Sequence, residues 1–234
     1  MKGWALVTGG AKRIGHAIVL ELAERGFDIV IHYHHSAEEA EELAEQIAAC
    51  GRKVVLAEID LANRDHVAKL IPSLTAEIGT VTALVNNASL FEPDAKDPDG
   101  SRHWAVNFEA PKILSQAFYE QGREGFKGAI VNLLDGCPPE EGFAHYLKSK
   151  RALQDETLLM AKRFAPYVRV NGVAPGPVLP NARQSERHHQ GLLQSTPLQT
   201  PIEPEDIARA TSFLLTSQAI TGNILYVNNG AIPE

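Results

Sequence analysis

Seven short apolar runs recur along the chain, with more polar segments between them. Each run is rich in valine, isoleucine and leucine, which is typical of strands buried on both faces of a parallel sheet. The runs comprise residues 4–8, 27–33, 53–59, 81–86, 128–134, 167–173 and 223–228. The pattern therefore predicts seven buried strands.

Amphipathic segments with recognisable helix ends lie between these runs. The first follows Gly15 and stops at Arg25-Gly26. Its apolar residues recur at four-residue spacing and are Ile14, Ile18 and Leu22. Ser36-x-x-Glu39 is the pattern of a capping box, so a second helix is expected from there to Gly51.

Strands that alternate with helices predict a parallel sheet with helices on both faces, and the whole chain, 1–234, is expected to form one α/β domain. A later helix should begin at Pro204, since proline suits a first turn. One region breaks the rhythm: residues 174–203 are polar and rich in proline. Connections of that length are usually lids or binding loops. We therefore expect a flap over the substrate there, with a short helix inside it.

Composition excludes several classes of partner. The net charge is −7 and no long basic run occurs, so nucleic acid is not expected to bind. The apolar run near the start is too short for a signal peptide or a membrane span, and no later run reaches that length, so no membrane partner is expected. The two cysteines, Cys50 and Cys137, lie in unrelated contexts, which favours a reducing, cytoplasmic compartment.

A glycine-rich turn, TGGAKRIG (8–15), joins the first predicted strand to the first helix. Glycines there permit close approach of the backbone to a pyrophosphate, and the helix start offers free N–H groups and a positive dipole end. The turn could also be a plain strand–helix connection, but its flanking elements favour dinucleotide binding. The expected contacts come from Gly9, Arg13, Ile14 and Gly15.

The same turn resembles the Thr-Gly-x-x-x-Gly-x-Gly turn of the short-chain dehydrogenase/reductase family, with Arg13 in place of the middle glycine. An arginine beside the adenosine ribose suits a 2′-phosphate. The second strand ends in IHYHHS without the carboxylate of NAD-specific sites. NADPH is therefore predicted over NADH, with His34, His35 and Ser36 as further donors to the phosphate. Ser36 could serve only as a helix cap, and the histidines could simply be solvent-exposed.

The resemblance extends to later segments and implies a doubly wound, seven-stranded Rossmann fold. Asp60 closes the third strand, where the family binds the adenine amino group. NNAS (86–89) resembles the family's Asn-Asn-Ala-Gly, and VAPG (173–176) follows the sixth strand. The resemblance implies cofactor contacts from these segments at Asn87, Ala88, Ser89, Pro175 and Gly176. It also implies a homotetramer.

Tyr146 and Lys150 are four residues apart and so share one face of a helix. A cation beside a phenol stabilises the phenolate, so we expect the pKa of Tyr146 to lie below its usual value. The family resemblance implies that Tyr146 transfers a proton and that Lys150 also contacts the nicotinamide ribose. It further implies that Asn107 holds a water of the proton relay, although a helix-interior asparagine with local bonds is an alternative.

Asp135 stands where the family's ketone reductases carry a serine. An ionised aspartate cannot donate to a carbonyl oxygen and repels the charge that develops on it. Either Asp135 is held protonated, or the substrate is not a simple ketone. Nitrogen heterocycles suit an aspartate better, because their C=N bonds need a proton and their amino groups donate to a carboxylate.

The chain is most similar to the pteridine reductase branch of the family, which includes bacterial dihydromonapterin and dihydrofolate reductases. NNASLF (86–91) resembles their Asn-Asn-Ala-Ser-x-Phe, and HYHHS resembles their His-Tyr-His-Arg-Ser except at His35. The resemblance implies that Ser89 contacts cofactor and pterin and that Phe91 covers one face of the pterin ring. Core packing is the alternative role for Phe91.

These observations predict an NADPH-dependent reductase that transfers hydride to a dihydropterin or dihydrofolate ring. Its catalytic residues would be Asn107, Asp135, Tyr146 and Lys150, and its substrate would contact Ser89, Phe91, Asp135 and Tyr146. No metal site is expected. The alternatives are an NADPH-dependent carbonyl reductase, such as a 3-oxoacyl reductase, and a cofactor-sensing binding protein without enzymatic activity.

Overall fold

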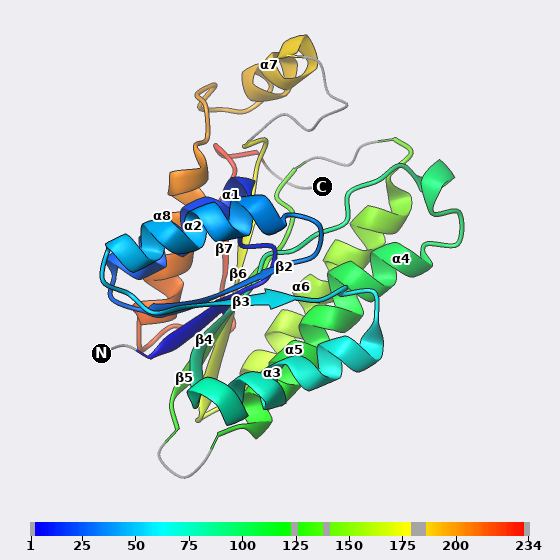
Figure 1. Ribbon diagram of the computed structural model, residues 1–234. Helices are drawn as coiled ribbons and strands as arrows, with labels where there is room; N and C mark the ends of the chain where they lie inside the picture. Colours follow the sequence, from blue (N-terminus) through cyan, green and yellow to red (C-terminus); the bar gives the residue numbers. More distant parts are fainter. Residues whose placement is uncertain (1–2, 123–125, 138–140, 179–185, 232–234) are drawn as a thin grey trace.

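Seven parallel strands form one twisted sheet in the order β3-β2-β1-β4-β5-β6-β7 (Figure 1). The computed structural model describes residues 3–122, 126–137, 141–178 and 186–231. The strands are β1 (Trp4–Val7), β2 (Asp28–Tyr33), β3 (Val54–Glu58), β4 (Val81–Asn86), β5 (Gly128–Leu133), β6 (Val168–Pro175) and β7 (Ile224–Val227). All seven predicted strands are confirmed. The five central strands are largely buried between the helical layers, whereas the edge strands β3 and β7 are only partly buried.

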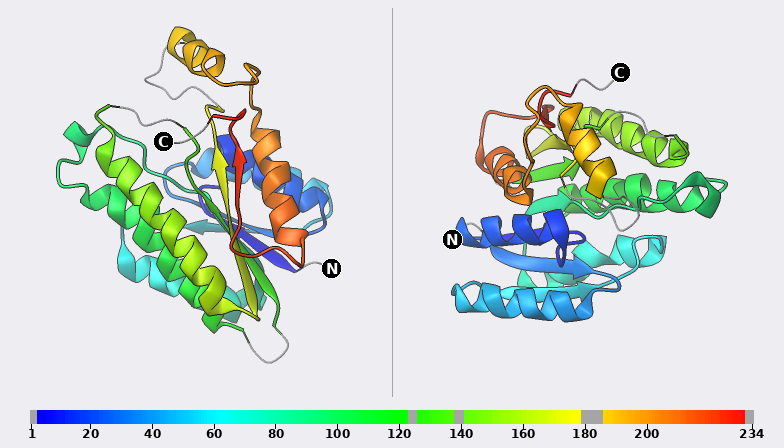
Figure 2. Two further views of the ribbon diagram at one scale, coloured as in Figure 1. Left: turned by 180° about the vertical axis from the view of Figure 1, so that it is seen from behind. Right: turned by 90° about the horizontal axis from the view of Figure 1, so that it is seen from above.

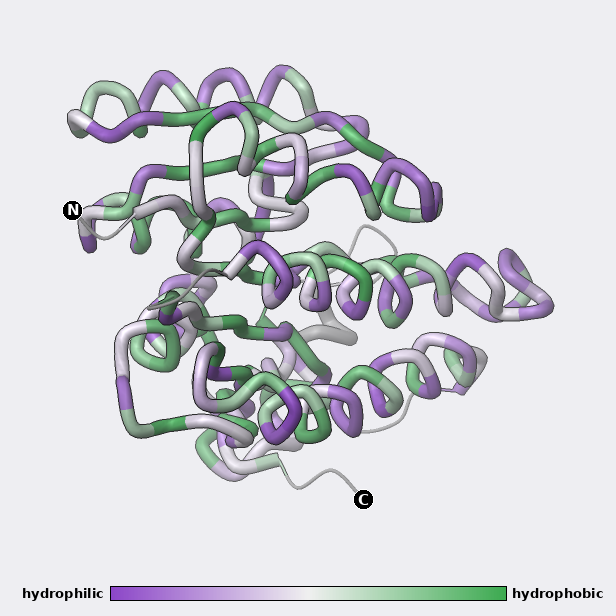
Figure 3. The backbone as a smooth tube through the Cα atoms, turned by 90° about the horizontal axis from the view of Figure 1, so that it is seen from below, coloured by the Kyte–Doolittle hydropathy of each residue, from purple (hydrophilic) through white to green (hydrophobic). Residues whose placement is uncertain are grey.

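Helices cover both faces of the sheet, as predicted (Figure 2). One face packs against α1 (Arg13–Glu24), α2 (Ala37–Ala49) and α8 (Pro204–Thr216). The other packs against α3 (Arg64–Ile78), α5 (Ala110–Glu120) and α6 (Ala144–Phe164). Hydropathy follows this arrangement, since the strands are apolar while the helices alternate between polar and apolar turns (Figure 3). The single Rossmann-type sheet of the prediction is thereby confirmed.

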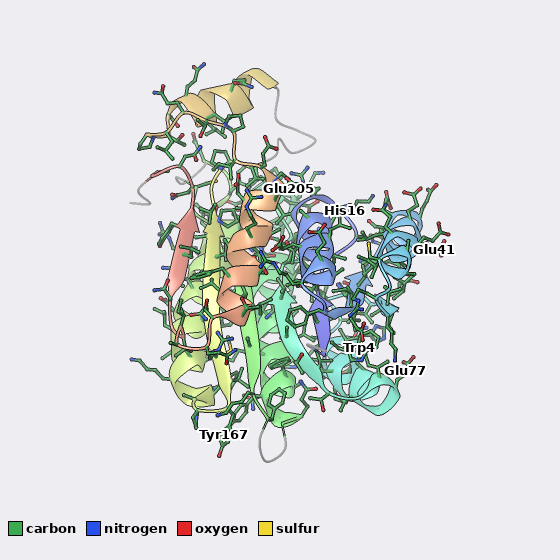
Figure 4. All side chains as sticks on the ribbon, turned by 90° about the vertical axis from the view of Figure 1, so that its left-hand side faces the viewer. Trp4, His16, Glu41, Glu77, Tyr167 and Glu205 are labelled. Carbon is green, nitrogen blue, oxygen red and sulfur yellow. The ribbon has the colours of Figure 1, made fainter. Side chains whose placement is uncertain are left out.

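The carboxyl ends of the strands all point to one end of the molecule. His16 in the first turns of α1 and Glu205 at the start of α8 lie at that end, whereas Trp4 and Tyr167 lie at the opposite end (Figure 4). The chain order reverses between β1 and β4, and open α/β sheets bind ligands at such a switch point.

Two helix starts differ from expectation. Helix α1 begins at Arg13, so Gly15 lies inside its first turn rather than before it. Ser36 does occupy the N-cap of α2, but its side chain makes no capping hydrogen bond. The capping box is therefore wrong, because the Glu39 carboxylate is drawn away into an ion pair with Lys12.

Several shorter elements lie near the carboxyl end of the sheet. A 3-10 turn, η1 (Asp94–Lys96), precedes α4 (Ser101–Trp104), and a π-helical segment, η2 (Ala105–Glu109), joins α4 to α5. The expected flap contains α7 (Glu186–Gln194), which stands clear of the sheet above the strand ends (Figure 1). Residues 179–185 of that flap lie outside the described residues. No helix within the described ranges has both the length and the apolar character needed to cross a membrane.

Candidate active site

A cavity of about 980 Å³ opens at the carboxyl end of the sheet, between the glycine turn and the start of α6. It brings together nearly all the side chains and backbone segments that the sequence singled out. These are Gly9, Arg13, Ile14, Gly15, His34, His35, Ser36, Asn87, Ala88, Ser89, Phe91, Asp135, Tyr146, Lys150, Pro175 and Gly176. Asp60 and Asn107 do not line it.

The glycine turn is closely packed, which explains its glycines. A Cβ on Gly15 would lie 2.1 Å from the Gly9 carbonyl oxygen, so no other residue fits there. Arg13 has a φ of +56°, in the left-handed region that a glycine tolerates more easily. The arginine therefore occupies the position at the cost of backbone strain, which points to a use for its side chain.

The buried side chain of His32 supports the glycine turn. The Gly9 N–H donates to His32 Nδ1 at 3.0 Å, and the opposite ring nitrogen, Nε2, lies 3.1 Å from the Ile59 carbonyl oxygen. This pairing requires the neutral ring with its proton on Nε2. Burial lowers the pKa of His32 to about 4, so the ring stays neutral at physiological pH.

Thr8 and Asn87 fix the other side of the turn. The Thr8 hydroxyl oxygen accepts from the backbone N–H groups of Asn87 and Ala88, both at 3.0 Å. The Asn87 amide donates to the carbonyl oxygens of Thr8 and Gly9. Asn87 thus braces the turn as well as lining the cavity.

Exposed cationic and imidazole groups gather at this end of the cavity. Lys12 and Arg13 come from the turn, and His34 and His35 follow β2 with their rings stacked 3.6 Å apart. Asp60 lies outside the lining: its Oδ1 accepts from the Ala62 N–H at 2.8 Å. Lys12 was not singled out from the sequence, although it precedes Arg13 directly in the glycine turn.

The opposite end of the cavity holds the Tyr146–Lys150 pair of α6. The Lys150 ammonium donates to the Leu133 carbonyl oxygen at 2.9 Å and lies 5.9 Å from the centre of the Tyr146 ring. Burial lowers the pKa of Lys150 to about 8, although the nearby Asp135 carboxylate opposes this. The two side chains share a helix face, as predicted.

The expected direction of the Tyr146 shift is wrong. Burial of the phenol raises its pKa well above the usual value of 10, and the negative charges of Asp135 and Cys137 raise it further. Desolvation thus outweighs the distant ammonium, because a buried phenolate loses its hydration. Tyr146 is therefore a protonated donor in this structure.

Asp135 lies at a corner just beyond β5 and lines the cavity, half-buried. One of its carboxylate oxygens accepts from the Cys137 N–H at 3.1 Å. The backbone of the next residue, Gly136, is held by two hydrogen bonds. Its N–H donates to the Pro175 carbonyl oxygen at 2.8 Å, and its carbonyl oxygen accepts from the side-chain amide of Asn228 at 3.1 Å. A Cβ on Gly136 would meet the Ala174 carbonyl oxygen at 2.6 Å, so the corner requires glycine.

Aromatic rings form the wall next to Tyr146. Phe91 stacks on Phe143, with centroids 4.4 Å apart and planes 11° from parallel. It also meets the Tyr146 ring edge-on at 4.7 Å. Sequence reasoning missed Phe143, because nothing in the chain pattern shows that it returns to Phe91. It likewise missed Glu141, Leu147 and Leu192 in the lining.

Asn107 sits one layer behind the wall, fully buried in the π-helical segment η2. Its amide nitrogen donates to the Leu90 carbonyl oxygen and to the Ser149 hydroxyl, and its oxygen accepts from the Leu90 N–H at 2.7 Å. The Ser149 hydroxyl in turn donates to the Tyr146 carbonyl oxygen at 2.6 Å. Asn107 therefore links the segment after β4 to the helix that carries Tyr146. No three His, Cys, Asp or Glu side chains of the described chain could together hold a metal.

Comparison with known proteins gives one family. Residues 3–191 match the short chain dehydrogenase family. The 3-oxoacyl-(acyl-carrier-protein) reductase FabG of Staphylococcus epidermidis is 31% identical, over 97% of both chains. The crystal structure of the FolM alternative dihydrofolate reductase 1 from Brucella canis, complexed with NADP, superimposes with a TM-score of 0.91. It is 34% identical and covers 97% of this chain and 93% of that one.

A third relative is a blue fluorescent protein from a metagenomic library, solved in complex with NADPH. It is 30% identical over 97% of both chains, with a TM-score of 0.88. These similarities span almost the whole length of the chain and agree with the seven-stranded parallel sheet. The protein is therefore an oxidoreductase that belongs to the short chain dehydrogenase family.

Proposed function

We propose that the protein is an NADPH-dependent reductase that transfers hydride to a pteridine ring. One observation carries the choice of substrate: Asp135 lines the cavity beside Tyr146. A carboxylate at that point repels the oxyanion of a reacting ketone. It accepts hydrogen bonds from the amino and ring N–H groups of a pterin.

The cofactor would lie along the wall from the glycine turn to Lys150. Its pyrophosphate suits the start of α1, where backbone N–H groups and the helix dipole favour anions. Arg13, Lys12, His34, His35 and Ser36 line the end where a 2′-phosphate would be held, which favours NADPH. Asp60, just beyond that lining, remains the proposed contact of the adenine amino group. When bound, NADPH supplies the hydride.

The ring would be held between the nicotinamide and the Phe91–Phe143 stack, with Ser89 at its edge. Tyr146 is protonated and so can donate a proton to a ring nitrogen. Asp135 accepts hydrogen bonds from the N–H groups of the ring and so orients it, and it can relay a proton from water to Tyr146 after the transfer. Lys150 places a positive charge beside both groups and supports the ribose, while Asn107 fixes the backbone on either side.

A direct test is steady-state reduction of dihydromonapterin, dihydrobiopterin and dihydrofolate with NADPH, by the wild type, Asp135→Ser and Asp155→Ser. Asp155 is an exposed residue of α6 and serves as the matched control. We expect wild-type turnover, a loss of 10²-fold or more in Asp135→Ser, in the range of general acid–base effects, and no change in the control. No NADPH oxidation with any of the three substrates at high enzyme concentration rules the proposal out.

A second candidate is a carbonyl reductase, favoured by the 31% identity to FabG. It predicts that Asp135→Ser raises the reduction of a 3-oxoacyl thioester, because a hydroxyl donor then replaces a carboxylate. If the protein is a pteridine reductase, neither the wild type nor Asp135→Ser should reduce the 3-oxoacyl thioester at a rate comparable to that of wild-type pterin reduction. The same pair of proteins therefore separates the two candidates.

A homotetramer is also proposed. Leu158 and Leu159 are exposed on the outer side of α6, and Trp104 is exposed on α4, so three large apolar side chains lie where the family resemblance expects neighbouring subunits. Light scattering behind a sizing column should give about four times the 25.5 kDa monomer mass. A monomeric mass contradicts this part of the proposal.

A further inference from the structure

The start of α6 is capped by a residue from a distant segment. The N-cap residue, Phe143, contributes no side-chain hydrogen bond of its own. Instead, the Asp94 carboxylate accepts from the N–H of Ala144 and from the N–H of His145, both at 3.0 Å. Helix starts leave such N–H groups without partners inside the helix. Asp94 therefore performs, from fifty residues away, what a local cap usually does.

Further bonds join the same two segments. The Asp94 N–H donates to the Gly142 carbonyl oxygen at 2.8 Å, and His145 Nε2 lies 3.1 Å from the Pro98 carbonyl oxygen. Gly100 leaves room for the His145 ring, which a Cβ would meet at 2.5 Å. The segment 94–100 is thus fastened to the first turn of α6 along its length.

This segment is itself fixed to the rest of the fold. The Asp97 carboxylate lies 2.6 Å from Nδ1 of the fully buried His103 and accepts from its backbone N–H at 2.9 Å. The opposite ring nitrogen of His103 accepts from the Glu92 N–H at 3.3 Å. Glu92 follows Phe91, so one set of bonds runs from the aromatic wall through His103 and Asp97 to the cap of α6.

We propose that Asp94 is a positioning residue, which sets the distance between the Phe91 wall and the Tyr146 hydroxyl. Tyr146 is the third residue of α6, and its ring edge rests on Phe91 at 4.7 Å. The slot for a flat ring therefore has one wall on the segment after β4 and its proton donor on α6. Asp94 joins the two directly. The proposal rests on the proposed roles of Phe91 and Tyr146.

Three variants test it: Asp94→Ala, Asp94→Asn and the control Asp99→Ala. Asp99 likewise accepts from a backbone N–H at a helix start, that of Ser101 at 3.0 Å, but α4 carries no proposed catalytic group. We expect Asp94→Ala to lower kcat for dihydromonapterin at least tenfold, since small misplacements of reacting groups have such effects. The Kd for NADPH should stay within twofold, because the 2′-phosphate end of the cavity is built from other segments.

Asp94→Asn should recover part of kcat, because its amide oxygen still accepts a hydrogen bond. Asp99→Ala should stay within twofold of wild type. A loss in Asp94→Ala no larger than in Asp99→Ala overturns the proposal, and so does a parallel loss of NADPH affinity.

Hydrogen exchange of the Ala144 and His145 amides separates this proposal from the proposed function. Both amides should exchange at least tenfold faster in Asp94→Ala than in wild type, whatever the substrate is. Unchanged exchange overturns the capping role. If the wild type reduces no pterin, the proposed function fails. Amide exchange and NADPH binding in the Asp94 variants then still test the capping role of Asp94.

Discussion

The two ends of the cavity are built in different ways. The proposed 2′-phosphate end consists of two short segments, 8–15 and 31–36, whose charged side chains are exposed. The proposed reaction end is assembled from the turns after β4 and β5 and the first turns of α6, with Lys150 buried and Phe91, Asp135 and Tyr146 half-buried. Contacts at the first end follow from local motifs, whereas those at the second depend on how distant segments pack.

Electrostatics differ between the ends for the same reason. Exposed side chains such as Arg13 and Lys12 keep their hydration, so their charges act on a ligand without a large desolvation cost. Burial dominates at the reaction end, where it lowers the pKa of Lys150 to about 8 and raises that of Tyr146. Substitutions at the two ends should therefore alter different measurements.

The largest effect is expected from Tyr146→Phe. Removing the hydroxyl takes away the proposed proton donor, so kcat for pterin reduction should fall about 10²- to 10⁴-fold. The Kd for NADPH, measured by fluorescence titration, should change little. Tyr226→Phe, on an exposed strand residue, is the control. A kcat near the wild-type value in Tyr146→Phe removes the tyrosine from the mechanism.

A smaller effect is expected from Arg13→Gly at the other end. Glycine suits the left-handed backbone of this residue, so only the guanidinium is lost. The loss of charge-assisted bonds to a 2′-phosphate, about 1.5–3 kcal/mol, should weaken NADPH binding roughly 10- to 100-fold and leave NADH binding unchanged. Arg25→Gly, at the far end of α1, should alter neither Kd. An equal loss of affinity for NADPH and NADH shows that Arg13 does not bind the 2′-phosphate.

The smallest effect concerns stability and pH. His32 has a folded pKa of about 4 against 6.5 unfolded, so the unfolded chain binds a proton first as the pH falls. Its contribution should lower the free energy of unfolding by about 1 kcal/mol between pH 7 and pH 5.5. When the free energy of unfolding is measured by urea titration at several pH values, His32→Gln should lack this part of its decrease with falling pH. The control His66→Gln, at an exposed histidine, should retain this decrease. The same pH dependence of the unfolding free energy in wild type, His32→Gln and His66→Gln contradicts the assignment.

Much of this molecule follows from the order of its residues. The strands were predictable because parallel strands covered on both faces are continuous apolar runs. The cavity residues of the glycine turn and of β2 were predictable because each motif lies within a few residues at a strand end. Asp135 was noticed because it is a charged residue at a position where the family's ketone reductases carry a neutral serine.

Other features depend on tertiary contacts that no local pattern records. The capping box at Ser36 failed because Lys12, from another segment, pairs with Glu39. The direction of the Tyr146 shift failed because spacing shows a nearby cation but not the burial of the phenol. Phe143 and Asp94 escaped notice because their partners lie about fifty residues away along the chain.

The Gly136 corner has a practical consequence for redesign. Its N–H and carbonyl groups are bonded to Pro175 and Asn228, and neither bond uses the side chain of the preceding residue. A saturation library at position 135 should therefore vary the chemistry of the cavity wall while these two bonds persist, and only the bond from the Cys137 N–H is lost where the new side chain has no acceptor. Screening such a library against ketones, imines and reduced heterocycles would show how the residue at position 135 determines substrate preference.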